Sequence, residues 1–313
     1  MSRVFVFPGQ GSQRPGMGQE LAETFSSARE VFQEIDEALG QNLSKLMREG
    51  PEDELTLTQN AQPALMASSM AVLLVLTTEG GKAVDQMCSM VAGHSLGEYS
   101  ALVAAGALPL DVTARLLRLR GEAMQAAVPV GQGAMAAILG LEVDDVRAIA
   151  EEASATGVCS VANDNSPGQV VVSGALAAVE RAAELAKEKG AKRAMMLPVS
   201  APFHCSLMQA AADAMAAALE TTTIQAPVVP IIANVTARPE TTPESIRTLL
   251  VEQVTATVRW RESMAALRDS DINTVTELGT GKVLSGLVRR IDRDLQASSI
   301  ETPADIESFL NTI

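Results

Sequence analysis

The segment Gly93-His94-Ser95-Leu96-Gly97 restricts the possible folds of this chain more than any other part of the sequence. The residues before it, 87–92, form a mostly apolar run of the kind found in strands that are covered on both faces. The residues after it, 96–105, have a helical composition and lead to Gly106, which suits a helix C-cap. A Gly-x-Ser-x-Gly sequence in this context predicts a sharp strand–turn–helix that exposes the serine at the helix N-terminus.

An exposed Ser95 needs a base, because a serine hydroxyl is a weak nucleophile until its proton is removed. The chain has only two histidines, His94 and His204. His94 lies inside the turn and is expected to be packed and hydrogen-bonded, because the turn exposes the serine and not its neighbour. If Ser95 is catalytic, His204 is therefore the predicted base. The alternative is a glycine-rich turn with an incidental serine.

A second glycine-rich loop, residues 8–13, follows the first predicted strand, residues 3–7. It has neither the P-loop pattern nor the dinucleotide-binding pattern. Such a loop can also place a hydrogen-bond donor beside a nucleophile, where the donor stabilises the oxyanion of an acyl-transfer intermediate. We expect Gln10 and the backbone N–H of Leu96 to be these donors. An ordinary strand–helix turn is the alternative for the loop.

Arg120 occupies an apolar position of a predicted helix over residues 111–127, for which Asp111 is the expected N-cap. Spaced at ~100° per residue, Arg115 and Arg118 fall outside the apolar arc, and Arg120 falls near its middle. A buried arginine has to be paired, and its planar fork suits a carboxylate. The pattern leaves two partners open: a buried Asp or Glu, or the carboxylate of a ligand.

Alternating strand and helix signals predict an α/β fold with a mainly parallel sheet. One region, residues 130–199, differs from this pattern, because its predicted order is βαββαβ, which is ferredoxin-like. We therefore expect a larger α/β-hydrolase-like domain, residues 1–129 and 200–313, interrupted by a small domain, with the substrate in the cleft between them. The small domain has predicted strands at 133–139, 158–162, 169–173 and 194–199 and predicted helices at 143–153 and 175–189.

Charge, hydropathy and cysteine content argue against binding to nucleic acid, a membrane-spanning segment and a metal site. The net charge of −14 argues against nucleic acid. The longest apolar runs, such as residues 70–76, are too short to span a bilayer, and no secretory signal is visible. The three cysteines are scattered and lack metal-ligand spacing. We expect a cytoplasmic protein with no metal site, no membrane segment and no bound cofactor.

Several motifs, taken together, resemble the malonyl-CoA:acyl-carrier-protein transacylase family, the stand-alone acyltransferases of bacterial fatty-acid synthesis. This family is related to the acyltransferase domains of polyketide synthases. The matching segments follow the family's order over nearly the whole chain. They are residues 7–13, 93–99, 120–121, 165–169 and 202–204.

The resemblance implies a ping-pong reaction in which Ser95 takes the malonyl group from coenzyme A as an ester. His204 acts as general base and then as the acid that protonates the leaving thiol, and the backbone carbonyl of Gln253 orients it. Arg120 holds the free carboxylate of the malonyl group. The second nucleophile is the phosphopantetheine thiol of acyl carrier protein, and the pathway is fatty-acid synthesis.

The resemblance also assigns the oxyanion hole to the backbone N–H groups of Leu96 and Gln10, and it gives Phe203 and Asn165 substrate-binding roles. Phe203 would crowd a 2-methyl group, which favours malonyl over methylmalonyl. The chain departs from the family at Thr257 and Thr280, where a proline is usual, and these departures concern the loops at the rim of the site.

Acyl carrier proteins are acidic, so an acidic enzyme needs a local basic patch to bind one. The expected patch is on the small domain, and the chain is expected to be a monomer. Candidates for the patch are Lys187, Lys189, Lys192 and Arg193, followed by Arg289 and Arg290. A solvated helix end is the alternative for the lysines.

Two other functions compete with the transacylase. A serine thioesterase or esterase would use the same Ser95 and His204, and it would differ only in letting water attack the acyl-enzyme. A carrier-protein binding module with an inactive site is the non-enzymatic alternative, and the joint presence of Ser95, His204 and Gln10 argues against it.

Overall fold

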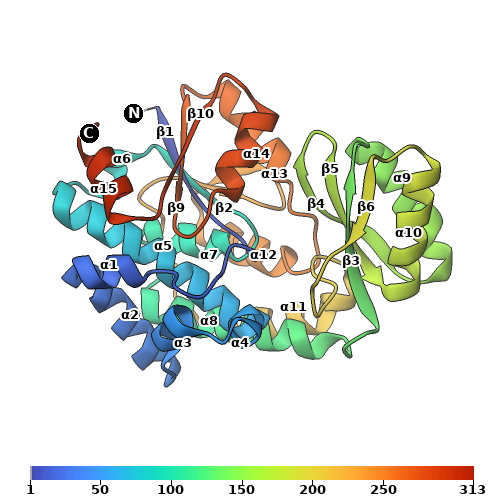
Figure 1. Ribbon diagram of the computed structural model, residues 1–313, viewed down its shortest axis with the longest axis horizontal. Coiled ribbons are helices and arrows are strands. Elements are labelled where there is room, and N and C mark those ends of the chain that lie inside the picture. Colours follow the sequence, from blue (N-terminus) through green and yellow to red (C-terminus); the bar gives the residue numbers. More distant parts are fainter. Residues whose placement is uncertain (1) are drawn as a thin grey trace.

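The computed structural model describes residues 2–313, apart from the side chain of Asp269, and contains two sheets (Figure 1). The larger has the order β10-β9-β1-β2-β7-β8 and is parallel except for the β7–β8 pair. This confirms the predicted α/β fold with a mainly parallel sheet. Its strands are β1 (Arg3–Phe7), β2 (Met90–Gly93), β7 (Ile231–Ala233), β8 (Arg238–Glu240), β9 (Thr274–Leu278) and β10 (Gln296–Ile300).

Helices cover both faces of this sheet, as the side chains of β1 show. Phe5 and Phe7 point into one buried cluster, and Val4 and Val6 point into another, because successive side chains of a strand face opposite ways. The first cluster includes α5 (Thr58–Gly80), α7 (Gly97–Ala104), α8 (Leu110–Ala127) and α11 (Gln209–Glu220). The second includes α13 (Trp260–Ala265) and α14 (Val283–Ile291).

The remaining helices of the larger part surround these layers (Figure 1). They are α1 (Gln19–Thr24), α2 (Ser26–Leu39), α3 (Leu43–Glu49), α4 (Glu52–Thr56), α6 (Val84–Met87), α12 (Pro243–Glu252) and α15 (Pro303–Leu310).

Helix α5 is long and apolar enough to cross a membrane by length and composition, although no continuous apolar run in it is that long. Short polar residues, such as Gln62, Ser68 and Ser69, interrupt its apolar runs and hide its length in the sequence. In the fold, 83% of its most apolar window is buried against other elements. It therefore serves as a core helix.

The smaller sheet is antiparallel with the order β4-β5-β3-β6, which confirms the ferredoxin-like prediction. Its elements are β3 (Gly133–Leu139), α9 (Val143–Ala153), β4 (Cys159–Ser166), β5 (Gln169–Ala175), α10 (Leu176–Glu188) and β6 (Arg193–Met196). One face, with Ala136 and Ile138, packs on α9 and α10. The other face, with Met135 and Ala137, joins the core of the larger part.

Four predicted boundaries are wrong. Helix α8 has Pro109 as its N-cap, so Asp111 lies in its first turn and pairs with Arg115 instead. Strand β2 begins at Met90, because residues 84–87 form α6. Strand β4 continues to residue 166 through irregular pairing with β5, although its second half is polar. Strand β6 ends at residue 196, shortly before Pro198, which has no N–H for a ladder.

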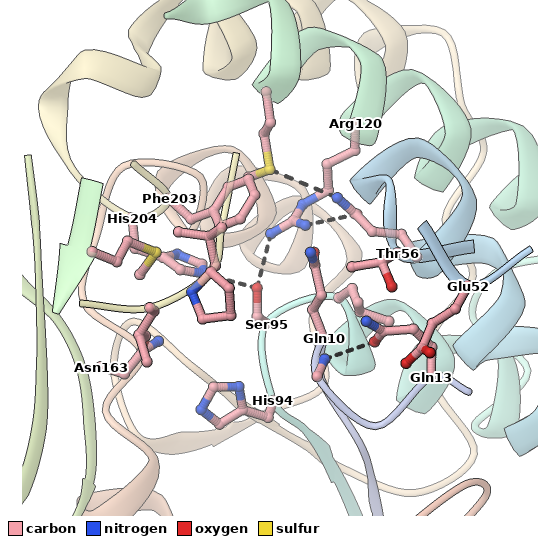
Figure 2. Close-up of a pocket in the computed structure, with 18 residues that line it drawn as sticks. Gln10, Gln13, Glu52, Thr56, His94, Ser95, Arg120, Asn163, Phe203 and His204 are labelled. Atoms are coloured by element: carbon pink, nitrogen blue, oxygen red, sulfur yellow. Dashed lines mark hydrogen bonds between the residues drawn. The ribbon is translucent and has the colours of Figure 1, made fainter. Parts of the chain in front are cut away.

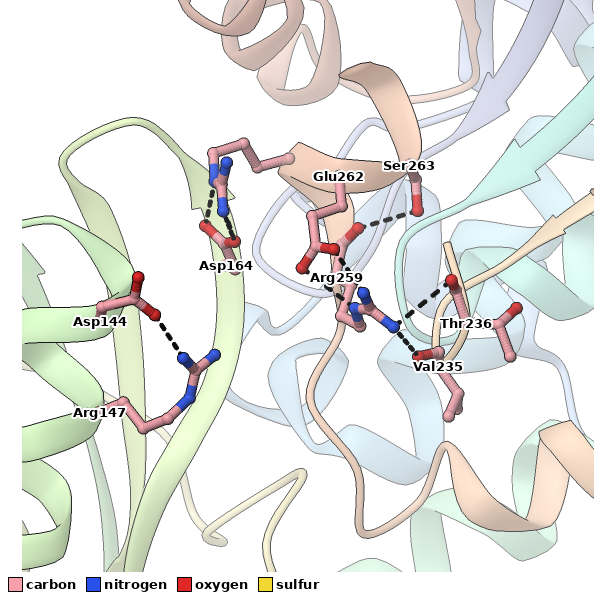
Figure 3. Close-up of polar contacts among 9 residues, drawn as sticks. Asp144, Arg147, Asp164, Val235, Thr236, Arg259, Glu262 and Ser263 are labelled. Atoms are coloured by element: carbon pink, nitrogen blue, oxygen red, sulfur yellow. Dashed lines mark hydrogen bonds and ion pairs between the residues drawn. The ribbon is translucent and has the colours of Figure 1, made fainter. Parts of the chain in front are cut away.

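A short segment before α13 fastens the smaller sheet to the larger part. The N–H of Val258 donates to the carbonyl of Ala162, and the N–H of Asp164 donates to the carbonyl of Val258. An ion pair lies beside it, because Arg261 Nε is 3.0 and 2.9 Å from the two carboxylate oxygens of the buried Asp164. Figure 3 labels Asp164 among the polar contacts of this region. These contacts hold β4 against the larger part of the molecule.

Both departures from the family pattern make a hydrogen bond that a proline could not. Thr257 Oγ1 donates to the carbonyl of Val161 at 2.6 Å, which adds to the fastening of β4. Thr280 is fully buried, and its hydroxyl lies 2.7 Å from the hydroxyl of Ser68 in α5. Each threonine thus stabilises the loop that contains it.

Candidate active site

The turn between β2 and α7 has the geometry of a nucleophile elbow. Ser95 has a φ of 54°, a left-handed conformation that costs a non-glycine residue roughly 1–3 kcal/mol. A Cβ atom on Gly93 would lie 1.8 Å from the carbonyl oxygen of Gly97, and one on Gly97 would lie 2.3 Å from that of Phe7. Only glycine fits at these two positions, and their close packing forces the serine outward.

Asn234, directly after β7, holds the elbow closed. Its Oδ1 accepts from the backbone N–H of Ser95 at 2.7 Å, and its Nδ2 donates to the carbonyl of Gly93 at 2.7 Å. Because the Ser95 N–H is occupied, it is not free to stabilise an oxyanion. Asn234 was not predicted from the sequence, where its only signal is a polar residue at the carboxyl end of an apolar strand.

Ser95 and His204 lie in hydrogen-bond contact, with 2.7 Å between Oγ and Nε2. On the other side of the ring, Nδ1 lies 2.8 Å from the backbone carbonyl of Gln253. A carbonyl can only accept, so Nδ1 carries the proton and Nε2 is left free to accept one. His204 is itself strained, with a φ of 60°. Among the described residues, only Ser95, His204 and Ala237 are non-glycine residues with positive φ.

Two backbone donors remain free beside Ser95. The N–H groups of Leu96 and Gln10 have no hydrogen-bond partner within residues 2–313. The side chain of Gln10 is engaged, because its Oε1 accepts from Thr58 Oγ1 at 2.9 Å. Its main-chain N–H has no partner among the described residues and can serve an oxyanion.

Arg120 is 1% exposed, yet it has no carboxylate partner within ion-pair distance among the described residues. Its Nη1 donates to Gln62 Oε1 and its Nη2 to Gln253 Oε1, both at 2.8 Å. Nη2 also lies 3.2 Å from Ser95 Oγ. The guanidinium carbon stands 5.7 Å from the centre of the Tyr99 ring, within cation–π range. The sequence left two partners open for Arg120: a buried Asp or Glu, or the carboxylate of a ligand. Among the described residues, no Asp or Glu contacts its guanidinium.

The nearest acid in this network is Glu98, which reaches Arg120 only through an amide. Gln253 Nε2 donates to Glu98 Oε2 at 2.8 Å and to the carbonyl of Ser95 at 2.9 Å. The side-chain roles of Gln62 and Glu98 were not predicted from the sequence. Both lie within apolar stretches of helices, where a buried polar side chain needs a hydrogen-bond partner. This position in the sequence was the only indication of their roles.

Burial controls the protonation of the site. It lowers the pKa of His204 to about 3, with a further decrease from the positive charge of Arg120. It raises the pKa of Glu98 to about 7, partly offset by its hydrogen bonds from Gln253 and Asn234 and by Arg120. His204 is therefore neutral in the resting site at pH 7, as a general base requires.

These groups open into a cavity of about 460 Å³ (Figure 2). Figure 2 shows Arg120 and His204 converging on Ser95, with Gln10 nearby and His94 set apart. Phe203 lines the cavity next to the base, and Met135 lines it from β3. Serine, a neutral imidazole, two free N–H groups and an unpaired guanidinium form a set that can acylate the serine with an acid-bearing acyl group.

Asn165 and His94, which were both discussed from the sequence, lie apart from the reacting atoms. Asn165 is not among the residues that line the cavity; its Oδ1 lies 2.9 Å from His94 Nε2. Asn163, two residues earlier on β4, lines the cavity instead. The ring of His94 also packs against the ring of Trp260, with centroids 5.6 Å apart and planes tilted by 57°, and burial lowers the pKa of His94.

The described residues contain no group of three or more His, Cys, Asp or Glu side chains that could hold a metal ion. The candidate basic patch is exposed: Lys187, Lys189, Lys192 and Arg193 all face solvent. Its charge is partly neutralised, because Lys189 Nζ lies 3.0 Å from Glu152.

Residues 4–300 match the acyl transferase domain family. The malonyl CoA-acyl carrier protein transacylase of Bacillus subtilis (strain 168) is 47% identical, covering 100% of this chain and 98% of that protein. The crystal structure of acyl-carrier-protein-S-malonyltransferase from Bartonella henselae is 55% identical, with a TM-score of 0.97 and coverage of 100% and 99%.

A third structure, of a type II PKS acyl-carrier protein in complex with its malonyl-transacylase, is 42% identical with a TM-score of 0.96 and full coverage of both chains. These similarities extend over the elbow, the base, the buried arginine and both sheets. The chain therefore belongs to the acyl transferase domain family and, within it, to the malonyl CoA-acyl carrier protein transacylases.

Proposed function

We propose that the protein transfers the malonyl group of malonyl-CoA to the phosphopantetheine thiol of an acyl carrier protein, through an ester on Ser95. One observation carries the residue assignments: the buried guanidinium of Arg120 lies 3.2 Å from Ser95 Oγ and lacks a contacting carboxylate among the described residues. A malonyl group on Ser95 would supply that carboxylate, which suits the fork of an arginine.

In the first half-reaction, Ser95 Oγ attacks the thioester carbonyl carbon while His204 Nε2 takes its proton, a transfer that the 2.7 Å contact permits. The carbonyl of Gln253 stabilises the imidazolium through Nδ1–H. The oxyanion forms between the free N–H groups of Leu96 and Gln10. The carbon–sulfur bond then breaks, and His204 returns its proton to the sulfur of coenzyme A.

The second half-reaction reverses these steps with another thiol. The phosphopantetheine thiol gives its proton to His204 and attacks the ester carbon, and the tetrahedral intermediate forms in the same oxyanion hole. When the bond to Ser95 Oγ breaks, His204 protonates the serine. Each step uses groups of the protein and its two substrates, so the mechanism needs no resident cofactor or metal.

Two further residues have proposed roles in substrate choice. Phe203 lines the cavity beside the base, where its ring would crowd a substituent on the malonyl C2. Asn165 contacts His94 and not the cavity, so we propose that it acts on the substrate indirectly, by fixing the ring of His94, which does line the cavity.

For the carrier protein, we propose the exposed basic residues of α10 and the β6 edge as the docking surface. Lys192 and Arg193 lie at the start of β6, and the segment that follows this strand, Leu197 to Val199, lines the cavity. Reversing the charges of Lys189 and Arg193 should weaken the apparent affinity for carrier protein and reduce its dependence on salt. An unchanged affinity and salt dependence would remove this surface from the proposal.

The cellular setting is also proposed. We infer a monomer in the cytoplasm that supplies fatty-acid synthesis, and the three free, buried cysteines support a reducing compartment. We further propose that residues 130–199 form a domain inserted into residues 1–129 and 200–313. A buried cluster confined to Ala134–Ala186 supports the separate core of the insert.

The test separates the transacylase from a thioesterase, which shares every step up to the ester. The protein is incubated with malonyl-CoA, with and without phosphopantetheinylated carrier protein, and each species is followed by intact mass. We expect a stable malonyl-enzyme without carrier and rapid transfer to the carrier thiol with it. Release of malonate at the same rate in both reactions would replace the proposal with a thioesterase, and no malonyl-enzyme at all would indicate an inert module.

A further inference from the structure

Glu98 is a buried carboxylate that pairs with no cation among the described residues. It is 2% exposed, and no cation lies within ion-pair distance of it among the described residues. It accepts hydrogen bonds from Gln253 Nε2 at 2.8 Å and from the backbone N–H of Asn234 at 3.2 Å. Burying a carboxylate without a counter-charge is costly. The role of Glu98 can therefore be inferred from the hydrogen bonds that it accepts.

The first contact determines how the side-chain amide of Gln253 is oriented. Its Nε2 faces two acceptors, Glu98 Oε2 and the carbonyl of Ser95, and its Oε1 faces Arg120 Nη2. An arginine side chain has only donors. The reversed amide would place its NH2 group against the guanidinium and its oxygen against the two acceptors. Glu98 and the Ser95 carbonyl thus hold the amide in one orientation.

The hydrogen bonds on the other side of Arg120 have a matching direction. Nη1 donates to Gln62 Oε1, Gln62 Nε2 accordingly donates to Thr58 Oγ1 at 3.0 Å, and Thr58 donates to Gln10 Oε1. The guanidinium is therefore held between two amide oxygens, neither of which neutralises its charge. Glu98 ends this chain of hydrogen bonds at a site away from the cavity.

We propose that Glu98 is a positioning residue for acyl-group selection. By accepting the hydrogen bond of Gln253 Nε2, it keeps Gln253 Oε1 turned toward Arg120 and so holds the guanidinium beside Ser95 Oγ. Glu98 contacts neither the reacting atoms nor the cavity, and it acts through Gln253. The inference rests on the proposed function, in which Arg120 binds the carboxylate of the acyl group.

The experiment compares Glu98→Leu, which removes the acceptor, with Glu98→Gln, which keeps an acceptor oxygen and removes the charge. KM and kcat for Ser95 acylation are measured with malonyl-CoA and with acetyl-CoA, which has no carboxylate. In Glu98→Leu, we expect the malonyl KM to rise and the malonyl-to-acetyl ratio of kcat/KM to fall about tenfold, since the hydrogen-bond acceptor that orients the Gln253 amide is lost. Glu98→Gln should stay within about threefold of the original ratio.

A purely structural role would lower the acylation rates with malonyl-CoA and acetyl-CoA equally in Glu98→Leu, and that result would overturn the inference. An equal loss of selectivity in Glu98→Gln and Glu98→Leu would also overturn it, because the charge and not the acceptor would then matter. These outcomes differ from failure of the proposed function, in which the unmodified protein itself forms no malonyl ester.

A second variant keeps the test valid if Glu98→Leu folds poorly. Gln253→Met deletes the amide and keeps the backbone carbonyl that contacts His204. It should show the same selective loss of malonyl acylation. Adding Glu98→Gln or Glu98→Leu to Gln253→Met should then change the malonyl-to-acetyl ratio no further, because residues that act through one contact are not additive. A further tenfold decrease in the double variant would contradict the role of Gln253 as the intermediary.

Discussion

Two asparagines contact the elbow, and their contacts differ in kind. Asn234, in the larger part, binds the main chain of Gly93 and Ser95 and is almost fully buried. Asn165, on β4 of the smaller sheet, contacts only the side chain of His94 and is half-buried. The larger part therefore fixes the reacting atoms themselves, while the smaller sheet supports a wall of the cavity.

The same division applies to the rest of the site. The larger part supplies the strained Ser95 and His204, the buried Arg120 and the amide of Gln253. The smaller sheet supplies Met135 and Asn163, which line the cavity without touching Ser95 Oγ. The reacting groups thus belong to the larger part, while the smaller sheet adds only to the wall of the cavity, and variants on the two sides should differ accordingly.

The largest effect is expected from Ser95→Ala, which removes the nucleophile from the larger part. Acyl-enzyme formation with malonyl-CoA should cease, and peptide mapping by mass spectrometry should find no malonyl ester at residue 95. The fold should survive, because the backbone contacts of Ser95 with Asn234 and Gln253 do not involve its hydroxyl. Retained labelling at another residue would refute the nucleophile assignment.

The next largest effect is expected from His204→Ala. Loss of the base should slow Ser95 acylation by about 10²–10⁴-fold, the usual contribution of general acid–base catalysis. Because transfer to the carrier uses the same imidazole, both half-reactions should slow, which single-turnover kinetics can separate. A loss confined to one half-reaction would show that another group serves the other.

The pH dependence of acetyl-CoA acylation sharpens the assignment, since acetyl does not engage Arg120. Burial, followed by the charge of Arg120, lowers the pKa of His204 to about 3, so the active, neutral base persists well below its ordinary pKa of 6.5. The acylation rate should therefore not fall as the pH is lowered from 7 to 6, the interval in which an ordinary histidine would become protonated. A limb near pH 6.5 would mean that the imidazole is solvated in the working enzyme.

The smallest effects distinguish the two asparagines directly. Asn234→Ala leaves the Ser95 N–H and the Gly93 carbonyl without partners, and it should lower the free energy of unfolding by about 1–3 kcal/mol as well as the acylation rate. Asn165→Ala should cost about 1 kcal/mol or less and change kcat/KM less than tenfold. Equal losses for the two variants, measured by denaturant unfolding and malonyl acylation, would contradict the division between the two parts.

The sequence was sufficient for the features that depend on local pattern. The elbow follows from glycines between a strand and a helix, and the burial of Arg120 follows from its place in the apolar arc of α8. The order of elements in the smaller sheet follows from turn signals and periodicity. These features need no knowledge of which distant residues meet.

The remaining features depend on distant contacts that no local pattern encodes. Asn234 lies 139 residues from Ser95 in the sequence, and Gln253 lies 155 residues from Glu98. The polar half of β4 became a strand only because β5 and the Val258 segment pair with it. The carbonyl that contacts His204 was indicated by family resemblance alone, since a backbone oxygen leaves no signature in the side chains.

The most direct test of the central claim is the selectivity of Arg120→Ala, with Arg120→Lys as a matched control that keeps the charge and loses the fork. The kcat/KM values for malonyl-CoA and acetyl-CoA are measured for both variants and the unmodified protein. We predict that Arg120→Ala lowers malonyl acylation about 100-fold and acetyl acylation less than tenfold, with Arg120→Lys intermediate, because a buried charge pair is lost only with malonyl. Equal losses with both substrates would show that Arg120 is structural and would contradict the account.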